Sequence, residues 1–177
     1  KKYKKKLIYR LGSGYGFFSE FNNLVLAMIY CLQNEIRFII SWKNSNFAYK
    51  EGWTDYFKPF CEETKSNFHI RFNTRDKHSH LSKSDLLTRT YKALTNSYLS
   101  RDLWPKFHNP EFVNSHFVFD KLDVTGNFLD VGKKVIDEIW EFQPHILEKI
   151  SLAQQKLKLP PDYYAIHIRG GDKITEA

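Results

Sequence analysis

The residues best suited to chemistry lie close together in the sequence HIRGGDKITEA, residues 167–177. Arg169 carries a permanent charge and a planar fork of N–H donors, which suits two-point contact with a diphosphate. Asp172 can orient that guanidinium, Lys173 adds a second cation, and Glu176 supplies a nearby carboxylate. Transfer from a nucleotide sugar needs such groups, because cations hold the departing diphosphate and a base takes the proton of the attacking hydroxyl.

A structural interpretation of the same residues is also open. Gly170 and Gly171 stand between Arg169 and Asp172 and allow a sharp turn and a close approach of ligand to backbone. A surface Arg–Asp ion pair in a turn between a strand and a helix would use the same residues without binding any ligand.

The glycine-rich segment GSGYG, residues 12–16, is a second candidate anion site. It lies between a predicted strand and a predicted helix, and the first turn of a helix offers unpaired N–H groups to an anion. The segment does not match the dinucleotide fingerprint, because the third glycine of G-x-G-x-x-G would fall on Phe17. A tight turn that needs glycine at positive φ explains the segment as well.

Hydrophobic periodicity predicts the elements that position this segment. Residues 7–11 and 37–42 are short apolar runs that are typical of buried strands. Between them, apolar residues recur at helical intervals over residues 18–33, which predicts an amphipathic helix. A strand, a glycine-rich loop, a helix and a strand form a βαβ unit, so we predict an α/β fold with a parallel sheet.

The middle of the chain is less regular. Residues 68–72 are compatible with a third strand, and residues 84–99 with a helix. Residues 103–109 are predicted to form a turn, and residues 111–119 another helix with Pro110 in its first turn.

Two helices, or one kinked helix, are predicted around Pro144, because proline removes a backbone donor and disfavours helix at the preceding residue. A stiff, proline-containing break at residues 159–162 predicts a domain boundary. Residues 1–158 would form one α/β domain, and residues 159–177 would begin a second domain with a strand at residues 163–168.

Composition indicates a globular protein with a basic surface. Hydrophobic residues make up 42% and charged residues 27%, and the net charge of +7 predicts attraction to anionic partners. Part of this charge comes from the lysine run at residues 1–6, for which a solvated arm is the alternative. No stretch approaches the ~20 apolar residues of a transmembrane helix, so the chain as given is expected to be soluble. Cys31 and Cys61 are interpreted as buried free thiols, which fits a reducing compartment.

Four aromatic residues support two interpretations. Aromatic rings line sugar-binding clefts and also fill cores, so the set is either a platform for an acceptor sugar or part of the core. The set comprises Trp42, Tyr49, Trp53 and Tyr56.

Three histidines, His69, His78 and His80, lie close in the sequence. An H-x-H pair without a nearby third ligand is more typical of a solvated loop than of a metal site. No motif supports Ser/His/Asp or Cys/His catalysis.

The segment HIRGGDKITEA resembles the H-V-R-R-T-D-K-x-x-T-E-A segment of the α1,6-fucosyltransferases that modify N-glycan cores. It is similar, more loosely, to the H-x-R-x-x-D motif shared with α1,2- and protein O-fucosyltransferases. Further features follow in that family's order: GSGYG before a helix, GW-x-x-x-F-x-P at residues 52–59, and a helix with Gln143, Pro144 and Leu147 upstream of the motif. The resemblance spans most of the chain, with the last eleven residues as its specific part.

The resemblance implies a GT-B glycosyltransferase fold with two Rossmann-like domains and GDP-fucose bound between them. It implies inverting transfer of fucose from GDP-fucose to an acceptor glycan, with no metal or other cofactor and no nucleic acid as a partner. Most of the donor-binding domain would lie beyond Ala177, so the chain is expected to be an inactive piece of a longer protein. The compartment would be either a bacterial cytoplasm or the Golgi lumen.

The resemblance also implies catalytic roles. Arg169 would bind the β-phosphate and stabilise the leaving GDP, Lys173 would assist the phosphate or relay a proton, and Glu176 would be the general base. This chain departs from the motif at two points: Gly170 and Gly171 replace an Arg and a Thr, and the interval from Lys173 to Glu176 is one residue shorter. Both departures bear on the α1,6 linkage more than on fucosyl transfer.

Donor-binding roles follow in the same way. His167 would contact the donor through its backbone or ring, and Asp172 would hold the Arg169 guanidinium. The opposite wall of the donor cleft would be lined by Gly14, Tyr15 and Gly16.

A rival hypothesis is a non-catalytic domain that binds nucleic acid or another anionic ligand. It is motivated by the net charge of +7 and the interspersed aromatic residues. It predicts oligonucleotide binding with a steep salt dependence and without preference for GDP.

Overall fold

The structure is a computed structural model that describes residues 3, 5–12, 16–74, 83–160 and 162. The chain divides into two compact units, Lys1–Gln143 and Pro144–Ala177. The predicted boundary after residue 158 stays a prediction, because most residues beyond it lie outside the described part.

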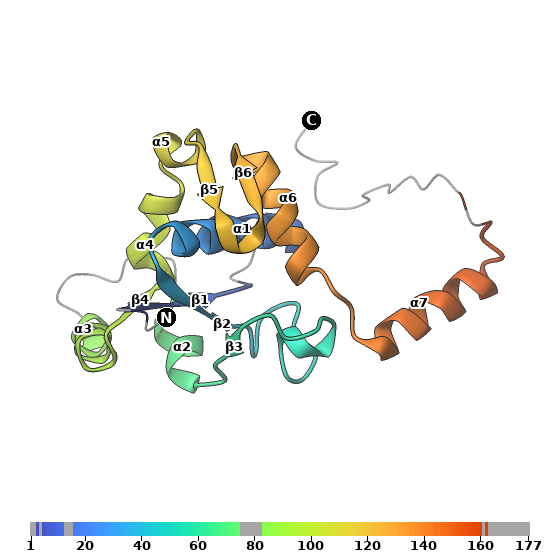
Figure 1. The fold of residues 1–177 in the computed structure, drawn as a ribbon. Helices are drawn as coiled ribbons and strands as arrows, with labels where there is room; N and C mark the ends of the chain where they lie inside the picture. Colours follow the sequence, from blue (N-terminus) through green and yellow to red (C-terminus); the bar gives the residue numbers. More distant parts are fainter. Residues whose placement is uncertain (1–2, 4, 13–15, 75–82, 161, 163–177) are drawn as a thin grey trace, which may run out of the picture. The chain divides into compact units, whose positions relative to one another are not determined.

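A sheet of four strands in the order β3-β2-β1-β4 lies at the centre of the first unit (Figure 1). β1 (Lys5–Arg10) pairs in parallel with β2 (Ile36–Ser41) and with β4 (Ser97–Leu99), and β3 (Glu62–Glu63) pairs in parallel with β2. α1 (Phe17–Gln33) connects β1 to β2. The predicted βαβ unit and the α/β class with a parallel sheet are therefore confirmed.

Helices cover both faces of this sheet (Figure 1). α1 and α4 (Ser100–Phe107) lie on one face, where the ring of Tyr9 packs against that of Phe107 with 6.4 Å between centroids. α2 (Asn67–Phe72) lies on the opposite face. A parallel sheet with apolar strands needs cover on both sides, and this arrangement is compatible with a Rossmann-like fold.

The elements of the first unit that follow α4 lie on the same side of the sheet as α1 (Figure 1). α5 (Pro110–Val113) leads to an antiparallel pair, β5 (Phe117–Phe119) and β6 (Val124–Gly126), which the 3₁₀ turn η2 (Asp120–Leu122) joins. α6 (Phe128–Ile139) follows and contacts α1.

A capping box fixes the start of α6. The Asn127 side chain accepts the N–H groups of Leu129 and Asp130, and the Asp130 carboxylate accepts the Asn127 N–H at 3.0 Å. These bonds satisfy donors that have no partner inside the helix.

Residues 68–72, predicted as a strand, belong to helix α2, so that prediction is wrong. The segment FHIRF alternates like a strand, but Ser66 accepts the N–H of Phe68 at 3.3 Å and caps a helix. The third strand along the chain is instead the short β3 on the edge of the sheet.

Three other boundaries also differ from prediction. α3 (Lys83–Thr95) ends before residue 99, because Asn96 adopts a positive φ of 48° and the next residues pair with β1 as β4. Residues 103–109 are mostly helical, within α4, rather than a turn. The helix predicted at residues 111–119 ends at Val113, and its last residues form β5.

The described part of the second unit contains the helix α7 (Pro144–Lys156). The prediction of separate helices around Pro144 is confirmed, and Pro144 is the first residue of α7, where its missing N–H is not needed. No helix in the described part of the chain is long and apolar enough to cross a membrane.

Candidate functional site

Gly16 is the predicted site residue that the structure describes. It is the exposed N-cap of α1, with φ −62° and ψ 148°, and no non-adjacent atom of the described residues lies within 4 Å of the position that a Cβ would take. Its backbone conformation does not require glycine. The other predicted site residues lie outside the described part: Gly14, Tyr15, His167, Arg169, Asp172, Lys173 and Glu176.

Gly12 shows why the glycine-rich segment needs a glycine at its start. Its φ is 82°, and an added Cβ would lie 2.5 Å from the Cβ of Ser45. The tight-turn interpretation therefore holds at Gly12. At Gly16 the described residues leave room for a Cβ.

A buried carboxylate braces the start of this segment. Glu20, in the first turn of α1, is fully buried and accepts the N–H of Gly12 at 3.2 Å. The positive end of the helix dipole stabilises a negative charge at this position. The sequence analysis did not single out Glu20, although a carboxylate one helical turn after a glycine-rich loop is a usable signal.

Arg10 ties the end of β1 to the loop after β2. Its guanidinium donates to the carbonyl oxygens of Lys43 at 2.7 Å, Ser41 at 3.3 Å and Asn44 at 3.3 Å. Burial lowers the pKa of Arg10. The side chain fixes the shape of the sheet's carboxyl edge, where ligands of parallel α/β sheets bind.

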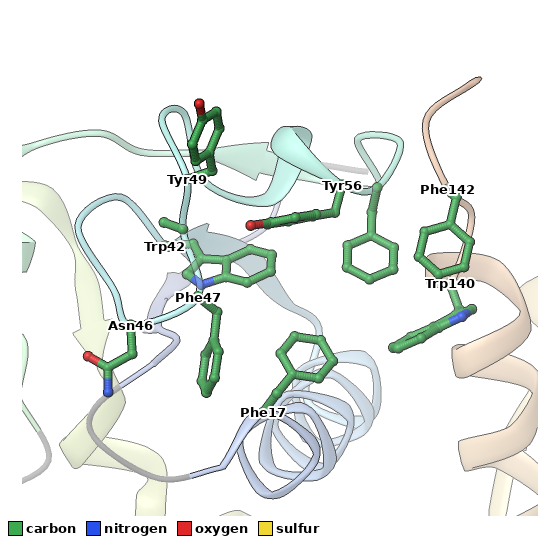
Figure 2. Close-up of a pocket in the computed structure, with 10 residues that line it drawn as sticks. Phe17, Trp42, Asn46, Phe47, Tyr49, Tyr56, Trp140 and Phe142 are labelled. Carbon is green, nitrogen blue, oxygen red and sulfur yellow. The ribbon is translucent and has the colours of Figure 1, made fainter. Parts of the chain in front are cut away.

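A cavity of about 490 Å³ opens at this edge (Figure 2). Eight of its ten lining residues are aromatic, and none of the ten is charged. We call it the aromatic cavity. It is lined by Phe17, Trp42, Asn46, Phe47, Ala48, Tyr49, Tyr56, Phe57, Trp140 and Phe142.

One wall of the aromatic cavity comes from the segments that follow β1 and β2. Phe17 begins α1, directly after Gly16, and Trp42 directly follows β2. The ring of Phe17 lies edge-on to that of Phe47 at 5.4 Å and 6.2 Å from that of Trp42. The βαβ unit therefore positions the Phe17 and Trp42 rings at the same wall of the cavity.

The other wall comes from two segments far apart in the sequence. Residues 56–58 pair with residues 141–143: the N–H of Gln143 donates to Tyr56 at 2.8 Å, and the N–H of Lys58 donates to Glu141 at 2.7 Å. This pairing brings Trp140 and Phe142 to the cavity (Figure 2).

The rings of this wall pack closely against one another. The Phe57 ring lies 4.9 Å from that of Trp140 and stacks at 5.1 Å on that of Phe142, with an interplanar angle of 19°. The wall is thus a continuous aromatic surface rather than a set of single rings.

Asp55 fixes the rim of the cavity. Its carboxylate accepts the backbone N–H groups of residues 49–52, with the bonds to Oδ2 between 2.9 and 3.1 Å. Burial acts to raise the pKa of Asp55, but these backbone hydrogen bonds outweigh it and hold the pKa below its usual range. The turn that carries Tyr49 is therefore held in place without a ligand.

Glu63 supports the turn behind the cavity. Its Oε1 accepts the N–H of Trp53 at 3.2 Å, and burial raises its pKa. Gly52 adopts a φ of 122°, and a Cβ there would collide with the Glu63 carboxylate. The glycine of the GW-x-x-x-F segment is therefore required for both conformation and space.

The sequence left two interpretations for four aromatic residues, a platform for an acceptor sugar or part of the core, and the structure distinguishes between them. Tyr49 and Tyr56 line the aromatic cavity, as the platform interpretation expects. Trp42 also borders the cavity, but its side chain is fully buried and belongs to the core. Trp53 is buried and donates its Nε1–H to the carbonyl oxygen of Lys58 at 2.9 Å, so the core interpretation holds for it.

Three candidates from the sequence have structural explanations or lie outside the described part. His69 is buried, with its Nε2 3.1 Å from the Tyr91 hydroxyl, and burial is the main cause that lowers its pKa to about 4. His78 and His80 lie outside the described residues. Within the described residues, no group of three or more His, Cys, Asp or Glu side chains is arranged to hold a metal ion.

Both cysteines are free thiols. Cys31 is buried and Cys61 is partly buried, and burial raises the pKa of Cys31 and raises that of Cys61 to about 12. Both are therefore protonated and unreactive near neutral pH.

Comparisons with family models, with curated proteins and with solved structures find no match to this chain. Function is therefore inferred from the residues themselves, from the parallel sheet and from the aromatic cavity.

Proposed function

We propose that the chain is part of an inverting fucosyltransferase that moves fucose from GDP-fucose to a hydroxyl group of an acceptor glycan. The observation that carries the proposal is the segment HIRGGDKITEA and its similarity to the donor-binding motif of fucosyltransferases. Residues 1–158 form the acceptor-side domain of a GT-B fold, and residues 159–177 begin the donor-binding domain.

The reaction uses charged groups of the motif. The acceptor oxygen attacks C1 of fucose, the bond from C1 to the β-phosphate oxygen breaks, and the configuration at C1 inverts. Arg169, oriented by Asp172, and Lys173 stabilise the negative charge that develops on the leaving GDP. The Glu176 carboxylate accepts the proton of the acceptor hydroxyl. His167 contacts the donor.

The described residues support this proposal in two ways. Strand β1 of the parallel sheet is followed by a glycine-rich segment, and Gly16 at its end is the N-cap of α1, a position that suits an anion. The aromatic cavity at the same edge has no charged residue among its described lining residues, so its chemistry complements that of a charged donor motif instead of repeating it.

The test uses the full-length protein with GDP-fucose and a panel of acceptor glycans, and it measures GDP release. We expect Arg169→Ala to lower the rate by about a hundredfold or more, as loss of a group that stabilises transition-state charge does. Arg89→Ala, which removes an exposed arginine from α3, is the matched control and keeps the rate. Near-normal activity of Arg169→Ala would refute the assignment.

Glu176→Gln separates the base from the donor contacts. We expect it to lower kcat far more than donor affinity, because the amide keeps the size of the side chain and cannot accept the proton. Equal activity of the variant and the parent protein would move the base to another residue.

A second candidate function is favoured by one observation at the opposite end of the sheet. A cavity of about 220 Å³, here called the cationic cavity, is lined by Tyr3, Lys5, Lys6, Arg37, Thr95 and Asn96. Three cations around one cavity fit a domain that binds an anionic ligand such as nucleic acid. Oligonucleotide binding that weakens steeply with salt, in a protein without transferase activity, would favour this candidate.

A further inference from the structure

We propose that the aromatic cavity is a carbohydrate-binding subsite that accepts an uncharged sugar ring. Its assignment to the acceptor glycan rests on the proposed fucosyl transfer. The binding of a sugar ring rests on the cavity alone, and the two can be tested separately.

The lining determines the class of ligand. A diphosphate or a carboxylate in the cavity would lose hydration without meeting a charged side chain among the ten residues known to line it. An uncharged pyranose has apolar C–H faces that pack on aromatic rings, and hydroxyl groups at its edge that stay hydrated or form hydrogen bonds. The volume of about 490 Å³ lies within the usual range for small-molecule sites.

The few polar groups of the lining suit sugar hydroxyls. The Asn46 amide and the hydroxyls of Tyr49 and Tyr56 can each donate and accept. Figure 2 shows the Tyr56 hydroxyl beside the Trp42 ring, with Asn46 and Tyr49 at the edge of the set. The indole Nε1–H of Trp42 is buried and has no hydrogen-bond partner among the described residues. Because this nitrogen is closed to solvent, the hydrogen bonds to a ligand would come from Asn46, Tyr49 and Tyr56.

The cavity is formed before a ligand arrives. Asp55 holds the turn that carries Tyr49, and the pairing of residues 56–58 with residues 141–143 holds the opposite wall. A rim that is already ordered costs less conformational entropy when a ligand binds. The site is thus suited to a weakly interacting ligand such as a neutral sugar.

A guanine base is the main competing occupant of an aromatic cavity. Recognition of guanine needs acceptors for its N–H groups, and in the described part of the lining there is no carboxylate and a single side-chain amide, that of Asn46. The lining therefore favours the sugar, and the experiment below includes GDP as a probe.

The experiment measures binding to the full-length protein by calorimetry, without any donor present. The probes are uncharged oligosaccharides that contain N-acetylglucosamine, galactose or mannose, sulfated forms of the same oligosaccharides, and GDP. The test variant is Tyr49→Ala, because Tyr49 is 74% exposed and its loss leaves the core intact. The control is Leu94→Ala on α3, which removes a side chain that is 82% exposed and distant in sequence from the cavity.

We expect Tyr49→Ala to weaken binding of an uncharged oligosaccharide about tenfold, which corresponds to the loss of one ring from the site. Its affinity for GDP should stay within about twofold of the parent value, and Leu94→Ala should match the parent for every probe. Tryptophan fluorescence should change on sugar binding, because Trp42 and Trp140 line the cavity.

Three outcomes would overturn the inference. These are binding of sulfated forms as tight as that of uncharged ones, loss of GDP affinity in Tyr49→Ala, or no binding of any uncharged oligosaccharide. If sugars bind as expected but GDP-fucose is never turned over, the proposed transfer fails and the sugar site stands. If transfer requires Arg169 but Tyr49→Ala leaves the acceptor KM unchanged, the transfer stands and the assignment of the cavity to the acceptor glycan fails.

Discussion

The two ends of the central sheet differ sharply in chemistry. At the carboxyl end, none of the described residues that line the aromatic cavity is charged. At the amino end, the cationic cavity collects Lys5 and Lys6 from β1 and Arg37 from β2. The same strands thus present apolar rings at one end and positive charge at the other, so the net charge of the chain is a poor guide to what its main cavity binds.

Helix direction explains part of this difference. In a parallel sheet the connecting helices end at the amino edge, as α1 does before β2 and α3 does before β4. The C-terminal carbonyl groups of helices favour nearby cations. Part of the charge at the amino edge therefore has a structural role, whereas the aromatic rings at the carboxyl edge leave an open cavity.

The largest effect is expected from Gly12→Ala at the carboxyl edge. The φ of 82° and the contact with Ser45 both oppose a Cβ, so we expect a loss of about 3 kcal/mol in the free energy of unfolding. Gly16→Ala is the matched control in the same segment, and it should change stability by less than about 0.5 kcal/mol. Urea denaturation measures both. Equal losses would show that the segment has a different conformation.

A pH effect of similar size is expected beneath the sheet, at His69. Its pKa is lowered to about 4, mainly by burial and further by the charges of Arg10 and Lys6. A lowered pKa means that the folded protein disfavours the protonated ring, so this contribution is complete above about pH 6.5 and is lost as the pH falls through 4. The full loss is about 3 kcal/mol.

Denaturation at pH 7 and at pH 4 tests this prediction. His69→Gln should flatten the difference between the two pH values, while His116→Gln, at an exposed position, should leave it unchanged. If both variants keep the parent's pH dependence, other groups cause the acid destabilisation.

These elements also show what the sequence could predict. The bounds of β1, α1 and β2 were predicted closely, because apolar runs indicate the two strands and helical periodicity of apolar residues indicates the helix. β3 could not be predicted, since Glu62–Glu63 is a two-residue edge strand whose pairing with β2 defines it. β4 was likewise assigned to a helix, because its three residues acquire their strand character from β1.

The candidate site could also be predicted only in part from the sequence. Trp42, Tyr49 and Tyr56 were singled out because they lie near one another in the sequence. Trp140 and Phe142 reach the cavity only through the pairing of residues 56–58 with residues 141–143, and no local pattern signals such a long-range contact. The predicted charged residues of the motif remain predictions.

Asp55→Ala should have an intermediate effect that distinguishes the two cavities. It removes the acceptor for the backbone N–H groups of residues 49–52, and we expect a loss of about 2 kcal/mol in stability. The affinity for uncharged oligosaccharides should fall as well, while oligonucleotide binding stays unchanged. Asp120→Ala, at an exposed position in η2, is the control. If Asp55→Ala keeps the parent's sugar affinity, the cavity rim does not depend on the hydrogen bonds that Asp55 accepts.

The smallest effect is expected at the amino edge. Arg37 forms an ion pair with Glu62 at 2.6 Å, and both side chains are more than half exposed, so Arg37→Ala should cost less than about 1 kcal/mol. The variant should keep the parent's affinity for uncharged oligosaccharides, because Arg37 does not line the aromatic cavity. Oligonucleotide titrations at several salt concentrations provide the other measurement. If Arg37→Ala flattens the salt dependence of a tight oligonucleotide complex, the cationic cavity binds an anionic ligand, because each phosphate contact that is lost lowers that slope.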